Sequence, residues 1–267
     1  MTPCTNCGEA AADVFCARCG EQQPGHHDLS LRHFAQHTLH ELVHLDSKLF
    51  MTLKELVARP GFVPQEYFAG RKTRYIPPLR FFLTLFAIQF LAFTVYKPAA
   101  LYSITSFKRF DANGALTHLV AKRAKTQHLP EEEFEARVDE RWHKNLSLLQ
   151  LANVLGVAVV LKVLHRRRYF AEHLVFSAYF LGFSYIVTLL FWPLYAVYGF
   201  HPGLLQRTLT GFTIAILLVY LFLAQRRFYG EGNTKTAVKT ALLWAGNYVV
   251  AVLIFAGSLI AALLQAR

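Results

Sequence analysis

The chain contains 267 residues, 54% of them hydrophobic and only 17% charged, with a formal net charge of +11 at pH 7. Because a soluble domain typically carries about 25% charged residues, this composition excludes an ordinary soluble protein and indicates an all-α membrane protein. The positive charge lies next to apolar segments, where it matches anionic lipid headgroups. We therefore expect membrane lipids as partners and no nucleic acid, whose binding requires a clustered basic and aromatic surface.

Near the N-terminus, four cysteines form two Cys-x2-Cys pairs: Cys4, Cys7, Cys16 and Cys19. Each pair offers two thiolates at a spacing that suits tetrahedral zinc, and a glycine after each pair allows the chain to turn around the sulfur. Two disulfides or a remnant without metal are the alternatives. No apolar signal segment precedes the pairs, which favours a reducing cytosol and thiols kept for metal. The pattern predicts a cytosolic zinc ribbon over residues 1–24, a module that can dock a protein partner.

Residues 28–59 form a predicted amphipathic helix that begins at DLSL and ends before Pro60 and Gly61. Its leucines share one face, which can lie on the membrane surface or cover the ends of the spans. The opposite face carries four histidines at helical spacing: His33, His37, His40 and His44. Such imidazoles can chelate a second metal or respond to pH, although a solvated polar face is the simpler interpretation.

A basic and aromatic elbow over residues 60–78 leads into the membrane region. Arg71 and Arg74 can bind phosphates, Tyr75 suits the headgroup region, and a double proline stiffens the entry into the first span. The elbow is either a topological anchor, which is the simpler interpretation, or a specific site for a phosphate or a lipid headgroup.

The region from residue 79 to 264 contains five apolar segments close to the length of about 20 residues that a helix needs to cross the hydrocarbon. These segments are Leu79–Tyr96, Leu146–Leu164, Leu174–Tyr198, Thr208–Ala224 and Ala241–Leu264. Four spans plus a re-entrant segment are the alternative. Pro193 is expected to kink the third segment without ending it. The predicted fold is a five-span helical bundle preceded by a zinc ribbon and an interfacial helix.

Basic residues set the predicted orientation, because Lys and Arg are retained in cytoplasmic loops. They flank the first span and fill the loops at 165–168 and 226–239, whereas the loop at 199–206 has none. The N-terminus is thus expected inside and the C-terminus outside. The long external loop at 97–145 contains a predicted helix that begins at Pro130 and continues without a breaker into the second span. It is either a solvated cap or a site for an external partner.

Glu172 and His173, at the start of the third span, are the most enzyme-like pair in the chain. A carboxylate beside an imidazole can act as a general acid and base, but adjacent helical residues point about 100° apart. We therefore favour a structural role, in which Glu172 pairs with an arginine, such as Arg168 or one in the elbow, and His173 faces the bundle. The candidate arginines near the first span are, in order, Arg74, Arg71 and Arg80. Arg167, in the basic turn, is a further candidate for binding a phosphate headgroup.

Several of these motifs occur together in a known family. The run LDSKLFMTLKELVARPGFVPQEYFAGRKTRYIPPLRFFLTL, preceded by CTNCG and FCARCGEQ, is similar to the bacterial membrane family catalogued as domain of unknown function 3667. RRRYFAEHLVF resembles the family's Tyr-x-x-Glu-His-x-x-Phe box, and RFYGEGNTKTAVK fits as well. The matching positions are Thr52, Leu53, Leu56, Pro60, Gly61, Gly70, Arg71, Arg74, Tyr75, Pro77, Pro78, Tyr169, Glu172, His173 and Phe176. The resemblance implies a protein of the bacterial inner membrane and implies no activity.

The sequence favours a non-enzymatic function. The ribbon and the elbow would form a docking and headgroup-binding platform on the cytosolic side, and the bundle would act as a scaffold or a conduit for lipid or small solutes. The alternative is a membrane-embedded enzyme acting on a phosphate-bearing lipid at the inner leaflet, with Glu172 and His173 as catalytic residues beside Arg71 and Arg74. An oligomer is compatible with either function.

Overall fold

The computed structural model describes residues 2–4, 6–11, 16, 18, 47–96, 103–108, 111, 113–198 and 204–266. The predicted histidine face, Cys19 and the part of the amphipathic helix before residue 47 lie outside these residues. In the described residues, regular structure is helical apart from strands β1 (Thr2–Pro3) and β2 (Ala10–Ala11), which pair antiparallel with Thr2 opposite Ala11. The all-α class predicted for the membrane region is therefore confirmed.

The helices follow one another as α2 (Ser47–Ala58), α3 (Phe62–Phe68), α4 (Pro78–Tyr96), α5 (Ile104–Lys108), α6 (Ala115–Thr126), α7 (Glu131–Gln150), α8 (Asn153–Leu164), α9 (Phe170–Tyr198), α10 (Leu204–Tyr229) and α11 (Asn233–Gln265). The helix end predicted before Pro60 and Gly61 is confirmed, because α2 stops at Ala58. α9 continues through Pro193, as expected for a proline that does not end the helix.

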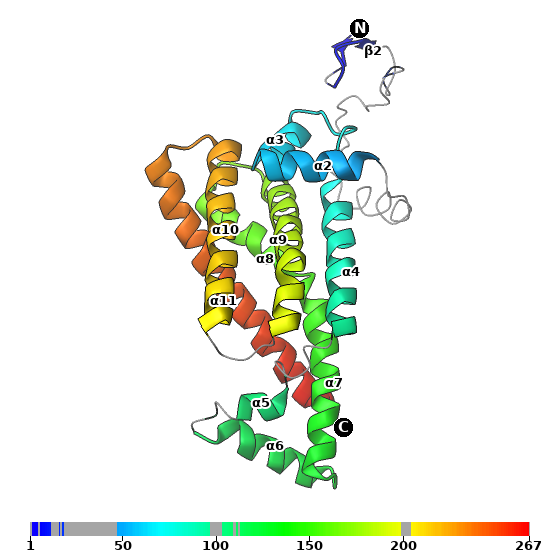
Figure 1. Ribbon diagram of the computed structural model, residues 1–267, viewed down its shortest axis with the longest axis vertical. Coiled ribbons are helices and arrows are strands. Elements are labelled where there is room, and N and C mark those ends of the chain that lie inside the picture. Colours follow the sequence, from blue (N-terminus) through cyan, green and yellow to red (C-terminus); the bar gives the residue numbers. More distant parts are fainter. Residues whose placement is uncertain are drawn as a thin grey trace.

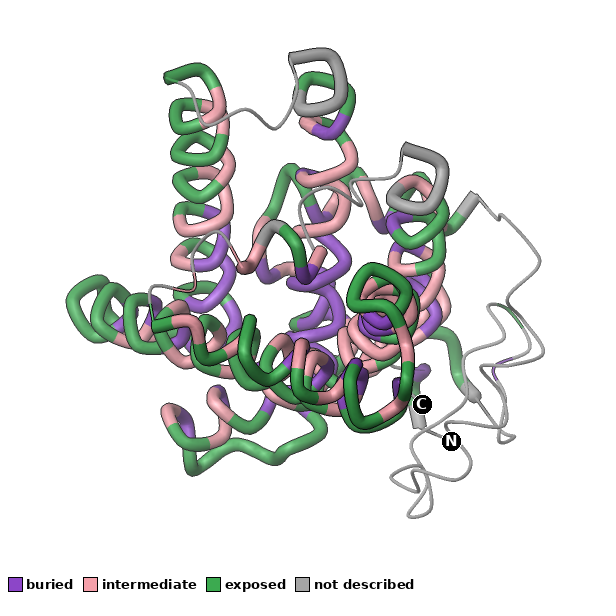
Figure 2. The backbone as a smooth tube through the Cα atoms, turned by 90° about the horizontal axis from the view of Figure 1, so that it is seen from below, coloured by how far each residue is buried: buried purple, intermediate pink, exposed green. Residues whose placement is uncertain are grey.

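Long helices form the body of the protein, and α2 and α3 lie across one end of this bundle (Figure 1). α9 occupies the centre, since it packs against α4, α8 and α10. Its most apolar window is 56% buried, against 22% for α10 and 17% for α11. Phe81, Phe176 and Tyr179 are fully buried in this core. Figure 2 shows buried residues on the inward sides of the helices and exposed residues on the outside, so α10 and α11 present the largest apolar surfaces to the surroundings.

Three helices are long and apolar enough to cross a membrane, namely α9, α10 and α11. α7 and α8 together qualify as a fourth, but they are bent by 44° at their junction, residues 151–152. α4 contributes a shorter apolar helix over Pro78–Ala92. The described residues thus support three to four spans, and the predicted five are not confirmed. The expectation that the external helix runs without a break into the second span is wrong. The break contains a leucine and an alanine, so no local helix breaker causes it.

A second hydrophobic core lies at the opposite end of the bundle, where α5 and α6 pack beside α7 and the C-terminal part of α11 (Figure 1). Trp142 is its largest buried side chain, and its indole Nε1 donates a 3.0 Å hydrogen bond to Ser258 Oγ. Gln127 Nε2 donates a 2.7 Å hydrogen bond to the Ala266 carbonyl. The predicted external loop is therefore a small helical subdomain that holds the end of α11.

The turn between α2 and α3 approaches the backbone of α10 closely. Gly61 has a φ of +79°, and a Cβ atom at this position would lie 2.4 Å from the carbonyl oxygen of Ala224. The Arg227 guanidinium adds a 3.2 Å hydrogen bond to the Pro60 carbonyl. Only glycine combines a left-handed backbone with room for this approach, which gives the Pro-Gly motif after α2 a physical reason.

Candidate functional site

A pocket of about 500 Å³ lies between the linker from α8 to α9 and the linker from α10 to α11. Both linkers are at the end of the bundle that carries α2 and α3 (Figure 1). The lining residues are Leu164, His165, Arg166, Arg167, Arg168, Tyr229, Glu231, Lys235 and Lys239, and we call this site the basic pocket. Its volume is within the range of pockets that hold small ligands, about 300–1,000 Å³.

Hydrogen bonds hold the arginines of the basic pocket in a defined turn after α8. The Arg168 amide donates a 3.1 Å hydrogen bond to the His165 carbonyl. Lys162 Nζ donates to the carbonyls of Arg166 and Arg168, at 2.8 and 2.7 Å. The ammonium of Lys162 thus binds two carbonyls of the turn that follows α8, and Arg166 and Arg167 are exposed.

His165 forms the buried wall of the pocket. Its side chain is 4% exposed, and its ring lies on Tyr229 with centroids 3.6 Å apart and planes inclined by 11°. Lys239 Nζ lies 3.3 Å from His165 Nδ1 and 2.6 Å from Glu231 Oε1, so an ion pair sits against the ring. Burial and then the Lys239 ammonium lower the pKa of His165 to about 4, although the Glu231 carboxylate acts in the opposite direction. The imidazole is therefore neutral at pH 7.

The charges of the basic pocket do not balance. Lys239 is paired with Glu231, and Arg168 is paired with Glu172 at 3.0 Å. The remaining basic side chains of the lining have no ion-pair partner among the described residues; they are Arg166, Arg167 and Lys235. Since His165 is neutral, these three cations remain as excess charge. A pocket of this size with such an excess of positive charge is suited to an anion, and guanidinium groups match phosphate and carboxylate in particular.

The candidate catalytic pair, Glu172 and His173, does not line the basic pocket. Glu172 accepts hydrogen bonds from Arg168 Nη1 at 3.0 Å and from the Tyr169 amide at 3.1 Å. The alternative partner Arg168, in the linker before α9, is thus confirmed, and the predicted clamp from Glu172 to an arginine near the first span is wrong. His173 is fully buried, as expected for a residue facing the bundle, and its Nδ1 lies 2.8 Å from the Tyr229 hydroxyl.

Hydrogen bonds tie the elbow to its neighbours. The Ile76 amide donates to Thr52 Oγ1 in α2 at 3.0 Å, and the Ile76 carbonyl accepts from the Tyr179 hydroxyl in α9 at 2.6 Å. Asn6 Nδ2, in the cysteine segment, donates to Thr73 Oγ1 at 2.8 Å. The elbow is thus the structural junction of α2, α9 and the N-terminal segment.

The predicted headgroup residues separate into two groups. Arg167 lines the basic pocket. Arg71 instead pairs with Glu66 of α3, and Tyr75 is buried, at 4% exposure, rather than directed to a headgroup. Arg74 is exposed on the elbow and does not line the basic pocket. Of the predicted headgroup residues, Arg167 is therefore the one that lies at the basic pocket.

Sequence reasoning missed the far side of the basic pocket, which consists of Tyr229, Glu231, Lys235 and Lys239. A usable signal was present, since the orientation rule places the basic loops at 165–168 and 226–239 on the same side of the membrane. Their contact across the bundle depends on which helices are neighbours, and the loops alone do not reveal this.

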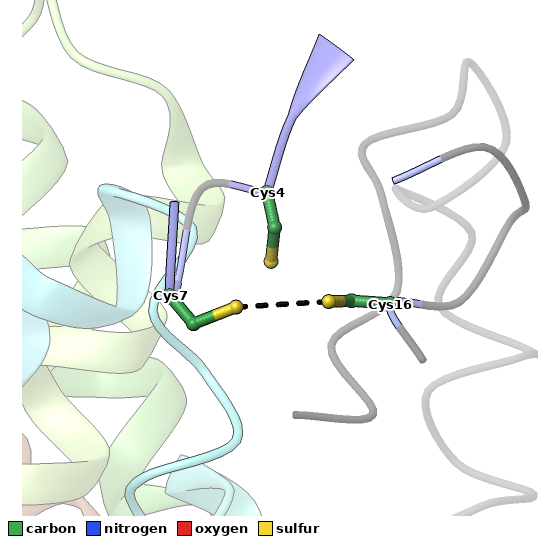
Figure 3. Close-up of side chains that lie close together, drawn as sticks. All are labelled: Cys4, Cys7 and Cys16. Atoms are coloured by element: carbon green, nitrogen blue, oxygen red, sulfur yellow. Dashed lines mark hydrogen bonds between the residues drawn. The ribbon is translucent and has the colours of Figure 1, made fainter. Parts of the chain in front are cut away.

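Three of the four predicted metal ligands lie together in the N-terminal segment. The sulfur atoms of Cys4, Cys7 and Cys16 point toward one another (Figure 3). They all lie within 4.8 Å of one another, with Cys7 and Cys16 3.6 Å apart. Tetrahedral zinc with bonds of about 2.3 Å would place its sulfur ligands about 3.8 Å apart, so this spacing fits a metal. Cys19 lies outside the described residues.

Together these features define a class: an α-helical chain whose several apolar helices are those of a membrane protein, with a basic pocket at one end of the bundle and a cysteine cluster in its N-terminal segment. Residues 46–90 match the family described as Protein of unknown function (DUF3667). The match confirms the family resemblance over α2, α3, the elbow and much of α4, and it does not include the cysteine segment. No curated protein and no solved structure matches the chain.

Proposed function

We propose that this protein binds phosphate-bearing lipid headgroups in the basic pocket, at the cytosolic face of a bacterial inner membrane. The observation that carries the proposal is the excess of positive charge from Arg166, Arg167 and Lys235 in a ligand-sized pocket. Phosphate matches the fork of a guanidinium group, and basic residues beside apolar helices lie at headgroup depth. In this proposal the bundle serves as a scaffold or as a conduit for lipid or small solutes.

Charge also supports the proposed orientation. Arg166 to Arg168 follow α8, Arg226 and Arg227 end α10, and Lys235 begins α11. These helix ends lie at the same end of the bundle as α2 and α3 (Figure 1). Because Lys and Arg are retained in the cytosol, this end faces the cytosol, and the N-terminus lies there too. The C-terminus, at the opposite end, is then extracytoplasmic.

We further propose zinc as the metal of the cysteine cluster, with Cys19 as the fourth ligand beside Cys4, Cys7 and Cys16. A four-thiolate site is closed, so its role is structural. The hydrogen bond from Asn6 to Thr73 supports a ribbon that rests on the elbow, where it can dock a cytosolic protein close to the membrane.

The enzyme alternative gains no support from the geometry. Glu172 is held by Arg168, and His173 is enclosed by the bundle and bonded to Tyr229. A general acid and base must reach the reacting atoms of a substrate, and neither side chain lines the basic pocket. Headgroup binding is therefore the function that we propose.

The test measures the binding of short-chain lipids to the full-length protein in a neutral detergent. Dioctanoyl phosphatidylglycerol, which is anionic, should bind, and dioctanoyl phosphatidylcholine, which has no net charge, should bind far more weakly. The variant R167Q/K235Q should weaken binding of the anionic lipid by about 30-fold, because each basic residue near an anionic lipid contributes about 1 kcal/mol.

The control variant K54Q/R226Q removes the same charge from exposed residues at the same end of the bundle, outside the pocket. It should change the affinity by about twofold or less. An equal loss in both variants would mean that only the general surface charge attracts the lipid, and it would contradict a pocket. The absence of binding by the anionic lipid would contradict headgroup recognition altogether.

A further inference from the structure

We infer that the basic pocket selects a doubly ionised phosphate, the phosphomonoester end of a lipid or of a small molecule, over a singly charged phosphodiester. The inference rests on the proposed headgroup binding and adds the charge and the shape of the group that is bound. It is carried by the arrangement of charged residues on the two linkers.

The number of uncompensated cations favours more than one negative charge on the ligand. Two of the five basic side chains in the lining are neutralised by neighbouring carboxylates, as the pairs of Lys239 with Glu231 and Arg168 with Glu172 show. Arg166, Arg167 and Lys235 remain. A phosphodiester has one negative charge and would leave two cations unbalanced. A phosphomonoester carries about −1.5 to −2 at pH 7, and neighbouring cations favour its doubly ionised form.

The positions of the cations also fit three terminal oxygens. Arg166 and Arg167 belong to the turn after α8, whereas Lys235 belongs to the first turn of α11 on the other side of the pocket. Guanidinium groups bind two oxygens at once, and an ammonium group acts as a compact point charge. A phosphomonoester offers three terminal oxygens to such a set, and a phosphodiester offers two because its other oxygens are esterified.

The surroundings of the pocket accommodate the rest of a lipid. Val163, in the last turn of α8, is 58% exposed, and Val238, in α11, is 56% exposed. Each is a close sequence neighbour of a lining residue, Leu164 and Lys239 respectively. Both helices that border the pocket therefore carry exposed apolar side chains, against which the acyl chains of a bound lipid can lie. A soluble phosphomonoester would use the basic residues alone.

The experiment titrates the full-length protein in neutral detergent at about pH 8 with three ligands: dioctanoyl phosphatidic acid, dioctanoyl phosphatidylglycerol and glycerol 3-phosphate. We expect phosphatidic acid to bind about tenfold more tightly than phosphatidylglycerol. The variant R166Q/R167Q should reduce this ratio to about one or two, and K54Q/R226Q should preserve it. The exposed single variant K235Q, which should lower the ratio by about threefold, provides a second measurement if the double variant does not fold.

Glycerol 3-phosphate distinguishes the two sources of the phosphomonoester. Its binding with an affinity close to that of phosphatidic acid would indicate a soluble ligand, and much weaker binding would indicate a lipid; either result supports the phosphomonoester class. Equal affinities for the two lipids, with both weakened in R167Q/K235Q, would overturn the inference and leave the proposed function standing. Binding of neither lipid would overturn both.

Discussion

The ring of His165 lies flat against Tyr229, with centroids 3.6 Å apart, and this contact joins the linker after α8 to the end of α10. The Tyr229 hydroxyl in turn lies 2.8 Å from His173 Nδ1 in α9. One aromatic side chain therefore connects two helices and the linker that carries the arginines. Aromatic contacts contribute about 0.5–1.5 kcal/mol beyond the area they bury. The wall of the basic pocket is thus part of the core and not a loosely held loop.

Protonation of His165 is expected to destabilise the folded protein below neutral pH. Burial and the Lys239 ammonium lower its pKa to about 4 in the folded state, from an ordinary value near 6.5. The unfolded chain binds the proton more readily, so the stability is fully present above about pH 6.5 and is lost as the pH falls toward 4. The loss amounts to about 2 to 3 kcal/mol. Thermal melting in neutral detergent, from about pH 7.5 to about pH 4.5, measures it.

Two variants separate His165 from other groups that titrate in this range. H165Q, which cannot be protonated at this position, should show a smaller fall in melting temperature between the two pH values. H118Q, which replaces an exposed histidine of α6, should keep the wild-type fall. The same pH dependence in H165Q and in the wild type would contradict a neutral, buried imidazole.

Substitution of Gly61 by alanine is expected to loosen the contact between α10 and the turn after α2. The new Cβ would meet the Ala224 carbonyl at 2.4 Å, and φ is +79°, so both the contact and the backbone would be strained. We expect a loss of about 1 to 3 kcal/mol of stability. Gly211→Ala is the matched control, since it lies in α10 with nothing within 4 Å of the new Cβ. It should be neutral or slightly stabilising, and equal losses in the two variants would contradict the close approach.

Metal analysis of protein purified under reducing conditions should find about one zinc per chain. C16S removes a sulfur of the cluster and should abolish the zinc, whereas N6A removes the hydrogen bond to Thr73 and should retain it. Chelation should unfold residues 1–20 while the melting of the helical bundle stays unchanged, because so short a segment cannot fold without metal. Wild-type protein without zinc, with its thiols intact, would refute the metal site.

Topology reporters test the number of crossings directly. A reporter fused after Arg267 should be active only outside the cytosol, and one inserted in the α10–α11 linker, at residues 230–232, only inside. With a cytosolic N-terminus, an external C-terminus requires an odd number of crossings. An external C-terminus would therefore exclude four spans. If α7 and α8 cross together as one bent span, α4 must then cross the membrane as well. A cytosolic C-terminus would instead require an even number of crossings, and α4 would then not cross the membrane if α7 and α8 do.

Residue types and their local sequence were sufficient to predict much of the fold. Apolar runs place α9, α10 and α11 because a helix in lipid must satisfy its own backbone and present apolar side chains. The end of α2 follows from Pro60 and Gly61, since proline lacks the amide that a helix needs. The burial of His173 follows in the same way, because a polar ring next to an apolar run is stabilised by facing other helices rather than lipid.

Tertiary structure decided what the site is made of. His165 and Lys239 are far apart in the chain, and only the packing of α8 against α11 brings their nitrogen atoms to 3.3 Å. Glu172 had several candidate arginines by sequence, and the linker before α9 places Arg168 at 3.0 Å from its carboxylate. The bend of 44° between α7 and α8 has no breaker residue. The pairing of His165 with Lys239 depends on which helices are neighbours, and the bend depends on how α7 and α8 pack against the rest of the chain, and residue types and their spacing along the chain do not contain this information.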